Sequence, residues 1–393
     1  MNARLLHRDV QEFLNEHLDK DLDRVIFKGS PFAGITVQEL AGQIQSKRKC
    51  KVKLPTWYRT PGIVYPPKLS IEQASSEKAA QYKASLVSGD HLADLSGGFG
   101  VDAYFFSQGF NQVLYCEANE DLMQIAEHNF EVLGAKNISC LSDDSMRHLK
   151  NSKESYDWIY LDPARRNDAR ERVFLLEDCS PNILENLDLL LSRANGLLLK
   201  LSPLLDISRA AEQLGCVEEI HVLALDNEVK ELLFLVNKEP VAPVRIHAVN
   251  LKGDLSETFS SEWESDDTPV CYGPAKAFLY EPNAAILKAG LFKQVAREFK
   301  LTKLHPNSHL YSSDELIPFP GRRFAVEKQM KYSPKKIRKE LGSTRAHITT
   351  RNFHESVAAI RKRTGLREGG NHYLFFTTDH EGRPLVLFCS KAD

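Results

Sequence analysis

The sequence lacks paired cysteines, long apolar runs, internal repeats and low-complexity segments. Its seven cysteines are scattered singly, without a Cys-x-x-Cys pair, so neither a disulfide framework nor a zinc site is expected. No apolar stretch approaches membrane-spanning length, and the first residues do not contain the apolar segment of a signal peptide. We therefore expect a cytoplasmic protein with reduced cysteines, no bound metal and no membrane partner.

The chain has almost no net charge, but its charges are unevenly distributed. The formal net charge is −2, whereas residues 319–393 contain 16 Lys and Arg against 7 Asp and Glu, a net of +9. The rest of the chain must then carry −11. A basic module on a mildly acidic protein favours an anionic partner, most often nucleic acid; a solvated basic face is the alternative.

Residues 91–108 have the pattern of a nucleotide-binding unit. A short apolar strand ends at Asp94, a loop with Gly97, Gly98 and Gly100 follows, and an amphipathic segment begins at Ala103. Glycines let the backbone approach a ligand closely, and a helix that begins there presents free N–H groups. Strand, glycine turn and helix together open a nucleotide-binding βαβ unit.

Three further apolar strands follow, and each ends in polar residues. These strand ends are Glu117, the pair Asp143-Asp144, and the run Asp162-Pro163-Ala164-Arg165. The carboxyl ends of parallel strands meet at one edge of an open α/β sheet, where such sheets bind ligands. We therefore expect these side chains to share one site with the glycine loop, beneath a serine-capped helix over residues 70–83.

The α/β run closes with a pattern that a dinucleotide-binding sheet does not have. Helices are predicted at 173–191 and 204–214, with an apolar strand at 196–201 between them. Strands at 218–225 and 231–236 then form a hairpin around Asp226-Asn227-Glu228. A nicotinamide-binding sheet ends in a sixth parallel strand, whereas an inserted antiparallel seventh strand is the mark of a class I methyltransferase sheet.

The glycine loop alone does not identify the cofactor. Gly98 to Ala103 satisfies the dinucleotide pattern G-x-G-x-x-A, and Glu117 follows at a suitable interval, but such a match is weak. A carboxylate at Asp94 would repel a pyrophosphate, and a dehydrogenase has no need of the Asp162 motif. S-adenosylmethionine offers an ammonium, a ribose diol and an adenine amine, and an acid for each (Asp94, Glu117, and Asp143 or Asp144) favours it over a dinucleotide.

These motifs resemble those of a known family. The segments DLSGGFGVD, LYCEANED, DDS and DPAR are similar to motifs I to IV of class I S-adenosylmethionine-dependent methyltransferases. The preceding KLSIEQASSEKAAQYKASL, the later FPGRRF and the basic tail resemble a bacterial family with a ferredoxin-like domain and a THUMP-like C-terminal domain. The resemblance implies a seven-stranded Rossmann-like sheet, S-adenosylmethionine as cofactor, and an RNA substrate such as tRNA or rRNA.

The resemblance also suggests site residues. The candidates for cofactor binding are Asp94, Ser96, Gly97, Gly98, Phe99, Gly100, Glu117, Ala118, Asn119, Asp143, Asp144 and Ser145. The catalytic candidates are Asp162, Pro163, Ala164 and Arg165.

The motif at Asp162 departs from the pattern of enzymes that methylate exocyclic amines of bases, [DNS]-P-P-[YFW]. Ala164 replaces the second proline and Arg165 the aromatic residue. Arg165 could stack on a base or clamp a phosphate. The alternative for Arg165 and Arg166 is an ordinary salt bridge to Asp143 or Asp157. No cysteine lies in this motif or directly follows Lys200-Leu201-Ser202-Pro203, which argues against methylation of pyrimidine C5 through a thiol adduct. We expect direct displacement at an amine nitrogen that Asp162 holds.

The sequence predicts four segments. Residues 1–68 read as a helical region that ends in a basic run at 47–53, which either contacts phosphate or is a solvated helix end. Residues 69–240 form the methyltransferase domain and 241–318 a ferredoxin-like α+β domain with an acidic loop at 257–267. Residues 319–393 form the basic domain, with helices at 334–341 and 353–363 and a closing hairpin at 373–389.

Eight cations in or beside the helices of the basic domain suit RNA binding. They are Arg322, Arg323, Lys331, Lys335, Lys336, Arg338, Lys339 and Arg351, interleaved with Phe324, Tyr332 and Phe353. The chain is thus predicted to be an RNA methyltransferase. A small-molecule or protein methyltransferase and a non-catalytic RNA-binding protein on the same fold are the alternatives.

Overall fold

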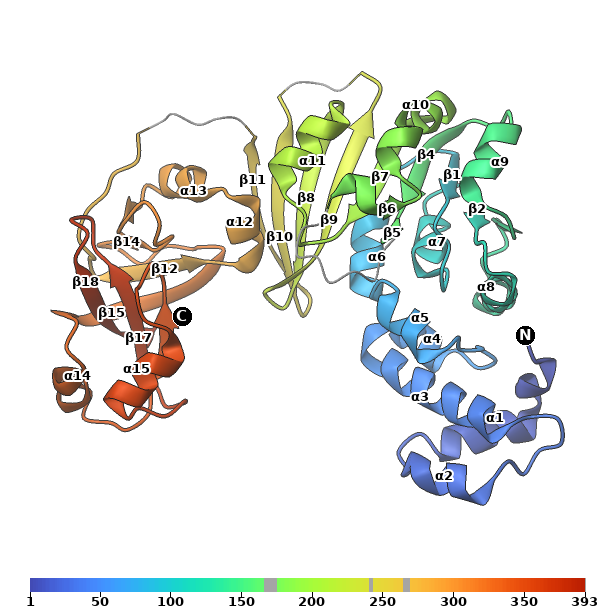
Figure 1. The fold of residues 1–393 in the computed structure, drawn as a ribbon, viewed down its shortest axis with the longest axis horizontal. Helices are drawn as coiled ribbons and strands as arrows, with labels where there is room; N and C mark the ends of the chain where they lie inside the picture. Colours follow the sequence, from blue (N-terminus) through green and yellow to red (C-terminus); the bar gives the residue numbers. More distant parts are fainter. Residues whose placement is uncertain (166–174, 240–242, 264–268, 393) are drawn as a thin grey trace. The chain divides into compact units, whose positions relative to one another are not determined.

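The computed structural model describes residues 1–165, 175–239, 243–263 and 269–392, without the side chain of Arg165. The chain divides into two compact units (Figure 1). The first contains Met1–Ile220 and Glu231–Ala242, and the second contains His221–Lys230 and Pro243–Asp393. Each unit is described separately below.

A twisted, mainly parallel sheet forms the centre of the first unit. Five parallel strands follow the order β3-β2-β1-β4-β7, namely Ile138–Leu141, Gln112–Cys116, His91–Asp94, Tyr156–Leu161 and Ala194–Leu201. Next to β7 lies β9 (Glu228–Asn237), which is antiparallel to it and separates it from β8 (Val217–Leu225). These seven strands, with the inserted antiparallel one, form the methyltransferase sheet expected from the sequence. Two further strands, β10 (Arg245–Lys252) and β11 (Leu255–Glu262), continue the sheet beyond β8 and bring it to nine strands.

The hairpin between β8 and β9 turns at Asp226 and Asn227, which have φ values of 48° and 65°. Positive φ at two successive turn residues is typical of type I′ turns, for which Asp and Asn are suited.

Helices cover both faces of this sheet and enclose an apolar core. They are α6 (Glu77–Ala84), α7 (Val101–Phe106), α8 (Glu120–Leu133), α9 (Ser145–Asn151), α10 (Ile183–Arg193) and α11 (Ile207–Leu214). The core contains fully buried residues of the central strands and of α7, including Leu92, Phe106, Tyr115, Tyr160 and Leu198. Burial of these side chains stabilises the sheet, so the strand ends outside the core can carry polar groups.

Two helix predictions in this unit are wrong in their extent. The helix expected over 70–83 is split into α5 (Lys68–Gln73) and α6, because Ser76 caps α6 by accepting a hydrogen bond from Ala79 N. The helix expected over 173–191 begins only at Ile183, where Asn182 caps it. Before it lie a short 3₁₀ turn (Leu176–Asp178) and β6 (Cys179–Ser180), and residues 173–174 lie outside the described part.

The N-terminal region is helical, as expected. It contains η1 (Ala3–Leu6), α1 (Arg8–Glu16), α2 (Leu22–Lys28), α3 (Val37–Lys53) and α4 (Pro55–Arg59). Its buried Trp57 packs within one cluster with Phe99 and Phe105, so this region lies directly against the glycine loop and α7.

Two lysines of the basic run at 47–53 bind neighbouring helices, whereas Lys49 and Lys51 are exposed. Lys47 Nζ donates to Asn15 Oδ1 (2.7 Å), and Lys53 Nζ donates to the backbone oxygen of Ile71 (2.8 Å). Within the described residues, no helix is long and apolar enough to cross a bilayer.

The second unit contains a seven-stranded sheet that runs through both of its predicted domains. Its strand order is β13-β14-β12-β15-β18-β17-β16, namely Thr302–Lys303, Tyr311–Ser313, Phe278–Pro282, Gly321–Lys331, Pro384–Lys391, Tyr373–Thr378 and His347–Thr350. The long strand β15 pairs with β12 on one side and with β18 on the other. The helices are α12 (Ala284–Ala289), α13 (Phe292–Glu298), α14 (Pro334–Leu341) and α15 (Val357–Thr364). The predicted helix at 334–341 and closing hairpin are confirmed.

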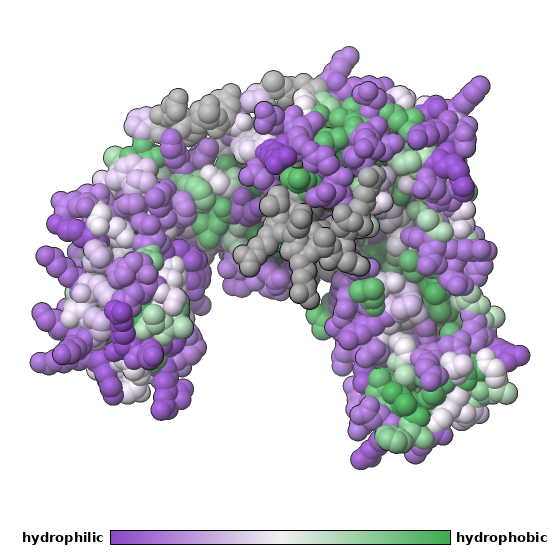
Figure 2. All heavy atoms as spheres, viewed as in Figure 1, coloured by the Kyte–Doolittle hydropathy of each residue, from purple (hydrophilic) through white to green (hydrophobic). Residues whose placement is uncertain are grey.

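Three local predictions in the second unit are corrected. Much of the expected acidic loop is strand β11 (Leu255–Glu262), which pairs with β10 (Arg245–Lys252), while residues 264–268 lie outside the described part. The helix expected at 353–363 begins at Val357 under a Ser356 cap, and the Glu355 carboxylate before it accepts hydrogen bonds from the Tyr332 hydroxyl and Arg363. Arg322, Arg323 and Lys331 lie on β15 rather than beside helices. The visible face of this unit is mainly hydrophilic (Figure 2).

Candidate cofactor and acceptor site

The glycine loop makes a tight turn between β1 and α7. Gly97 N donates to the backbone oxygen of Cys116 (3.0 Å), and a Cβ atom at Gly97 would lie only 2.6 Å from the Tyr115 ring. Gly98 and Gly100 have φ values of 57° and 79°, which side chains rarely permit. Glycine is therefore required here both by crowding and by backbone conformation, as expected for a loop that a ligand approaches closely.

A cavity of about 440 Å³ opens at this loop. Its walls come from the glycine loop, from the junction of α5 and α6, and from the carboxyl ends of β2, β4 and β7. The lining residues among the sequence candidates are Ser96, Gly97, Gly98, Phe99, Gly100, Glu117, Asp162, Pro163 and Ala164. The sheet edge therefore brings together the first, second and fourth of the predicted motifs.

Glu117 is fixed by backbone amides at one end of the cavity. Its Oε2 accepts from Gly98 N and its Oε1 from Asn119 N, each at 2.8 Å. Each carboxylate oxygen has a second lone-pair site, so Glu117 can still accept hydrogen bonds from a pair of hydroxyl groups.

Asp94 lies behind the glycine loop and does not line the cavity. It is 1% exposed, and its Oδ1 accepts from both Ser96 N (3.0 Å) and Ser96 Oγ (3.1 Å). Burial, assisted by the negative charges of Asp102 and Asp162, raises the pKa of Asp94 to about 7. The hydrogen bonds of Asp94 reach the cavity lining through Ser96, whose Oγ also accepts from Asp162 N (2.8 Å).

Asp162 forms an ion pair that the sequence analysis did not foresee. The ammonium of Lys200, at the carboxyl end of β7, donates to Asp162 Oδ2. Both residues line the cavity. Burial alone would lower the pKa of Lys200, but Asp162, Glu231 and Asp102 outweigh it and raise the pKa well above its usual range. Lys200 is therefore a charged donor that orients the Asp162 carboxylate.

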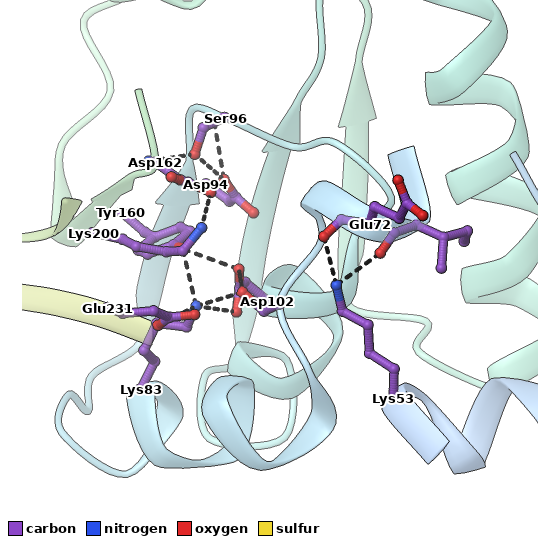
Figure 3. Close-up of polar contacts among 12 residues, drawn as sticks. Lys53, Glu72, Lys83, Asp94, Ser96, Asp102, Tyr160, Asp162, Lys200 and Glu231 are labelled. Carbon is purple, nitrogen blue, oxygen red and sulfur yellow. Dashed lines mark hydrogen bonds and ion pairs between the residues drawn. The ribbon is translucent and has the colours of Figure 1, made fainter. Parts of the chain in front are cut away.

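A second group of polar side chains lies below Lys200 (Figure 3). The fully buried Lys83 Nζ contacts Asp102 Oδ1 (2.9 Å), Glu231 Oε2 (3.2 Å) and Ser75 Oγ (2.6 Å). Tyr160 donates its hydroxyl hydrogen to Asp102 Oδ2 (3.0 Å). Burial acts to raise the pKa of Asp102, but the ammonium groups of Lys83 and Lys200 lower it overall. Asp102 and Ser75 also line the cavity.

The remaining cofactor candidates lie outside the cavity lining. Asp143 pairs with Arg147, Asp144 caps α9 by accepting from Arg147 N (2.8 Å), and Ser145 is the first residue of that helix. Asn119 caps α8, and Ala118 before it is exposed. A cofactor role for these five residues stays a prediction.

Arg165 cannot be placed as a site residue. Its backbone pairs with Cys179 in the short ladder of β5 (Ala164–Arg165) and β6, but its side chain and all of Arg166 lie outside the described part. Of its two candidate salt-bridge partners, Asp143 binds Arg147, and Asp157 accepts from Asp90 N and His91 N.

The sequence analysis missed Ser75, Lys83, Asp102, Lys200 and Glu231. A signal for Lys200 was available, because it stands at the end of an apolar parallel strand, where the other site residues were sought. Asp102 follows the last loop glycine by two residues. No sequence pattern marks Lys83 or Glu231, which meet only after the chain has folded.

Comparison with known proteins places this geometry in a family. Residues 278–320 match a family model for a ferredoxin-like domain, and residues 321–391 match one for a domain similar to THUMP. A crystal structure described as a methyltransferase from Porphyromonas gingivalis W83 is 32% identical, with a TM-score of 0.89, over 100% of this chain and 99% of its own.

Two further relatives are more distant. An uncharacterized S-adenosylmethionine-dependent methyltransferase of Mycobacterium tuberculosis is 25% identical over 76% of this chain and 80% of its own length. An uncharacterized RNA methyltransferase of Mycoplasma mobile is 27% identical over 23% of this chain and 25% of its own length. Three findings agree: the full-length similarity to the Porphyromonas structure, the inserted antiparallel strand and the two C-terminal matches. The chain belongs to the family of S-adenosylmethionine-dependent methyltransferases that carry a ferredoxin-like and a THUMP-like domain at the C-terminal end.

Proposed function

We propose that this protein transfers the methyl group of S-adenosylmethionine to an amine nitrogen of a base in tRNA or rRNA. The observation that carries the proposal is Asp162, which lines the glycine-loop cavity at the carboxyl end of β4 with one carboxylate oxygen bound to Lys200. The THUMP-like match, the basic C-terminal region and the partial similarity to an RNA methyltransferase support RNA as the substrate.

The residues of the cavity fit the proposed cofactor. The crowded, positive-φ glycines leave room for a ligand against the backbone, and Glu117 can accept from ribose hydroxyls. The carboxylates of Asp102 and Asp162 in the cavity wall suit a ligand that carries positive charge. When bound, S-adenosylmethionine supplies a methyl group on a cationic sulfur.

The chain's own residues would act mainly by positioning and electrostatics. Asp162 Oδ2 is bound to Lys200. No described residue donates to Oδ1, so this oxygen would accept a hydrogen bond from the N–H of the acceptor. That bond would direct the nitrogen lone pair at the methyl group and give the departing proton an acceptor. Ser96 would hold the Asp162 backbone in place, because its hydroxyl accepts from Asp162 N.

The first test is Asp162→Ala. We expect turnover on unmodified tRNA or rRNA to fall at least about 100-fold, because positioned proton acceptors contribute about that much. Affinity for S-adenosylhomocysteine, measured by calorimetry, should stay within several-fold. Asp314→Ala is the matched control, since it removes an exposed carboxylate that pairs with Lys276. Full activity of Asp162→Ala would refute the role of Asp162, and a wild-type protein that binds NAD but not S-adenosylhomocysteine would refute the cofactor.

A further inference from the structure

Five charged side chains form one continuous cluster at the end of the cavity where Asp162 lies (Figure 3). Lys200 pairs with Asp162, and Lys83 pairs with both Asp102 and Glu231. Asp102 and Glu231 also act on Lys200, since both raise its pKa. The cluster thus holds two ammonium groups and three carboxylates, and Asp102, Asp162 and Lys200 are themselves part of the cavity wall.

Most of this cluster is shielded from water. The side chains of Lys83, Glu231, Asp102 and Lys200 are 0%, 6%, 12% and 15% exposed, whereas that of Asp162 is 36% exposed. Charges in such surroundings are weakly screened by salt and act on a neighbouring ligand more strongly than surface charges do. The lowered pKa of Asp102 and the raised pKa of Lys200 keep both ionised at neutral pH.

We propose that this cluster gives the reacting end of the cavity a net charge of one negative unit, so that the cavity binds a sulfonium ligand more tightly than the neutral thioether that remains after methyl transfer. The inference rests on the proposed use of S-adenosylmethionine at this cavity. It assigns a role to Glu231, Asp102 and Lys83, which lie behind the reacting groups. Together with Asp162 and Lys200, their charges sum to one negative unit.

Among the residues that the structure describes, the neighbouring charges do not reverse this sign. Asp94, with its pKa raised to about 7 by burial, adds part of a further negative charge at neutral pH. Lys53 adds a cation farther out, and its Nζ donates to the backbone oxygens of Ile71 and Glu72 at the end of α5 (2.8 Å each). The partial negative charge of a helix carboxyl end offsets part of that cation.

The experiment compares the affinities of S-adenosylmethionine and S-adenosylhomocysteine, which differ by the sulfonium methyl and its charge. Calorimetry on the full-length protein gives the ratio of the two dissociation constants. In Glu231→Gln, which keeps the side-chain shape but removes one negative charge, we expect S-adenosylmethionine to bind about tenfold more weakly, as unit charges within several ångströms imply. Affinity for S-adenosylhomocysteine should stay unchanged, and the effect should persist in high salt.

Three more variants make the test independent of one substitution. Asp162→Asn removes a negative charge at a half-exposed position and should shift the ratio in the same direction. Lys200→Met removes a positive charge and should shift it in the opposite direction. Glu72→Gln is the matched control, since it removes an exposed carboxylate of α5 that pairs with Lys49, and it should leave the ratio unchanged. Near-ultraviolet circular dichroism checks that each variant is folded.

The outcomes separate this inference from the proposed function. Equal weakening of both ligands in folded Glu231→Gln and Asp162→Asn, or no weakening of either, would overturn the inference while leaving the cofactor site in place. A wild-type protein that binds neither ligand would overturn both. A charge-dependent ratio in a protein that methylates no RNA would support the inference and count against the proposed acceptor.

Discussion

A buried charge cluster of the first unit and an exposed helix of the second place their charges in opposite ways. In the first unit, the cluster of Lys83, Asp102, Glu231, Lys200 and Asp162 lies mostly out of water, and every member has a partner. In the second unit, helix α14 carries four exposed cations, Lys335, Lys336, Arg338 and Lys339. Both arrangements suit charged ligands, but they suit them differently.

The difference follows from screening. Buried charges act over a few ångströms on one ligand, depend little on salt, and destabilise the fold if a partner is lost. Exposed charges act together over about 10 Å, weaken in salt, and can be changed individually at little cost to stability. The first arrangement can distinguish two ligands that differ by one charge, and the second can attract a polyanion of any sequence.

The sharpest test of this contrast is the stability of Lys83→Met. The substitution leaves Asp102 and Glu231 buried without their shared cation, so we expect a loss of about 3–5 kcal/mol in the free energy of unfolding. Urea denaturation monitored by fluorescence measures it. Lys49→Met removes a half-exposed partner of Glu72 and should cost less than about 1 kcal/mol. Similar losses in the two variants would remove the distinction between the two kinds of charge.

A second test uses the pH dependence of stability. Burial raises the pKa of Asp94 from 3.8 to about 7 in the folded protein. The folded state therefore holds this proton more tightly, which adds stability below about pH 4 that is lost as pH rises to 7. Asp94→Asn cannot ionise, so between pH 5 and pH 8 it should lose on the order of 2–3 kcal/mol less stability than the wild type. Urea denaturation at both pH values measures the free energies of unfolding. If wild type and Asp94→Asn lost the same stability between pH 5 and pH 8, Asp94 would not be a buried ionisable group.

The smallest expected effect concerns the exposed cations. The double substitution Lys335→Glu and Lys336→Glu should weaken RNA binding about tenfold at moderate salt and flatten its salt dependence, because fewer phosphate contacts release fewer counterions. Fluorescence anisotropy over a series of salt concentrations measures both. The same reversal at Lys20 and Lys28, exposed lysines of the N-terminal helical region, is the matched control. Equal losses from both pairs would mean that RNA responds only to total charge.

The sequence predicts the sheet and the glycine loop well, because both depend on local patterns. Apolar strands that end in polar residues, and a hairpin signal at Asp226-Asn227, each lie within a few neighbouring residues. The split between α5 and α6 was missed because Ser75 and Ser76 are tolerated in a helix. The buried position of Ser75 depends on its hydrogen bonds with Lys83 and the distant Asp102. Much of β11 was read as a loop, because its charged residues hide a strand that pairs with β10.

The candidate site was foreseen only in part, for a related reason. Glu117 and Asp162 end strands and line the cavity as expected, whereas the acids after β3 serve as a helix cap and a surface pair. The buried cluster joins residues as distant in sequence as Lys83 and Glu231. Such partners are chosen by the folded sheet rather than by any local pattern, so only the structure could bring them together.

Strand β15 joins the two family modules of the second unit in one sheet. The two family matches meet between residues 320 and 321, yet the strand that begins at Gly321 pairs with β12 of one module and with β18 of the other. Two segments that match separate family models thus share a single hydrogen-bonded sheet. A cut at the sequence boundary would leave each piece with an unpaired edge, and such edges aggregate. Each family match can therefore recur as a separate sequence module, whereas the two modules together form the smallest unit of this sheet that we expect to fold.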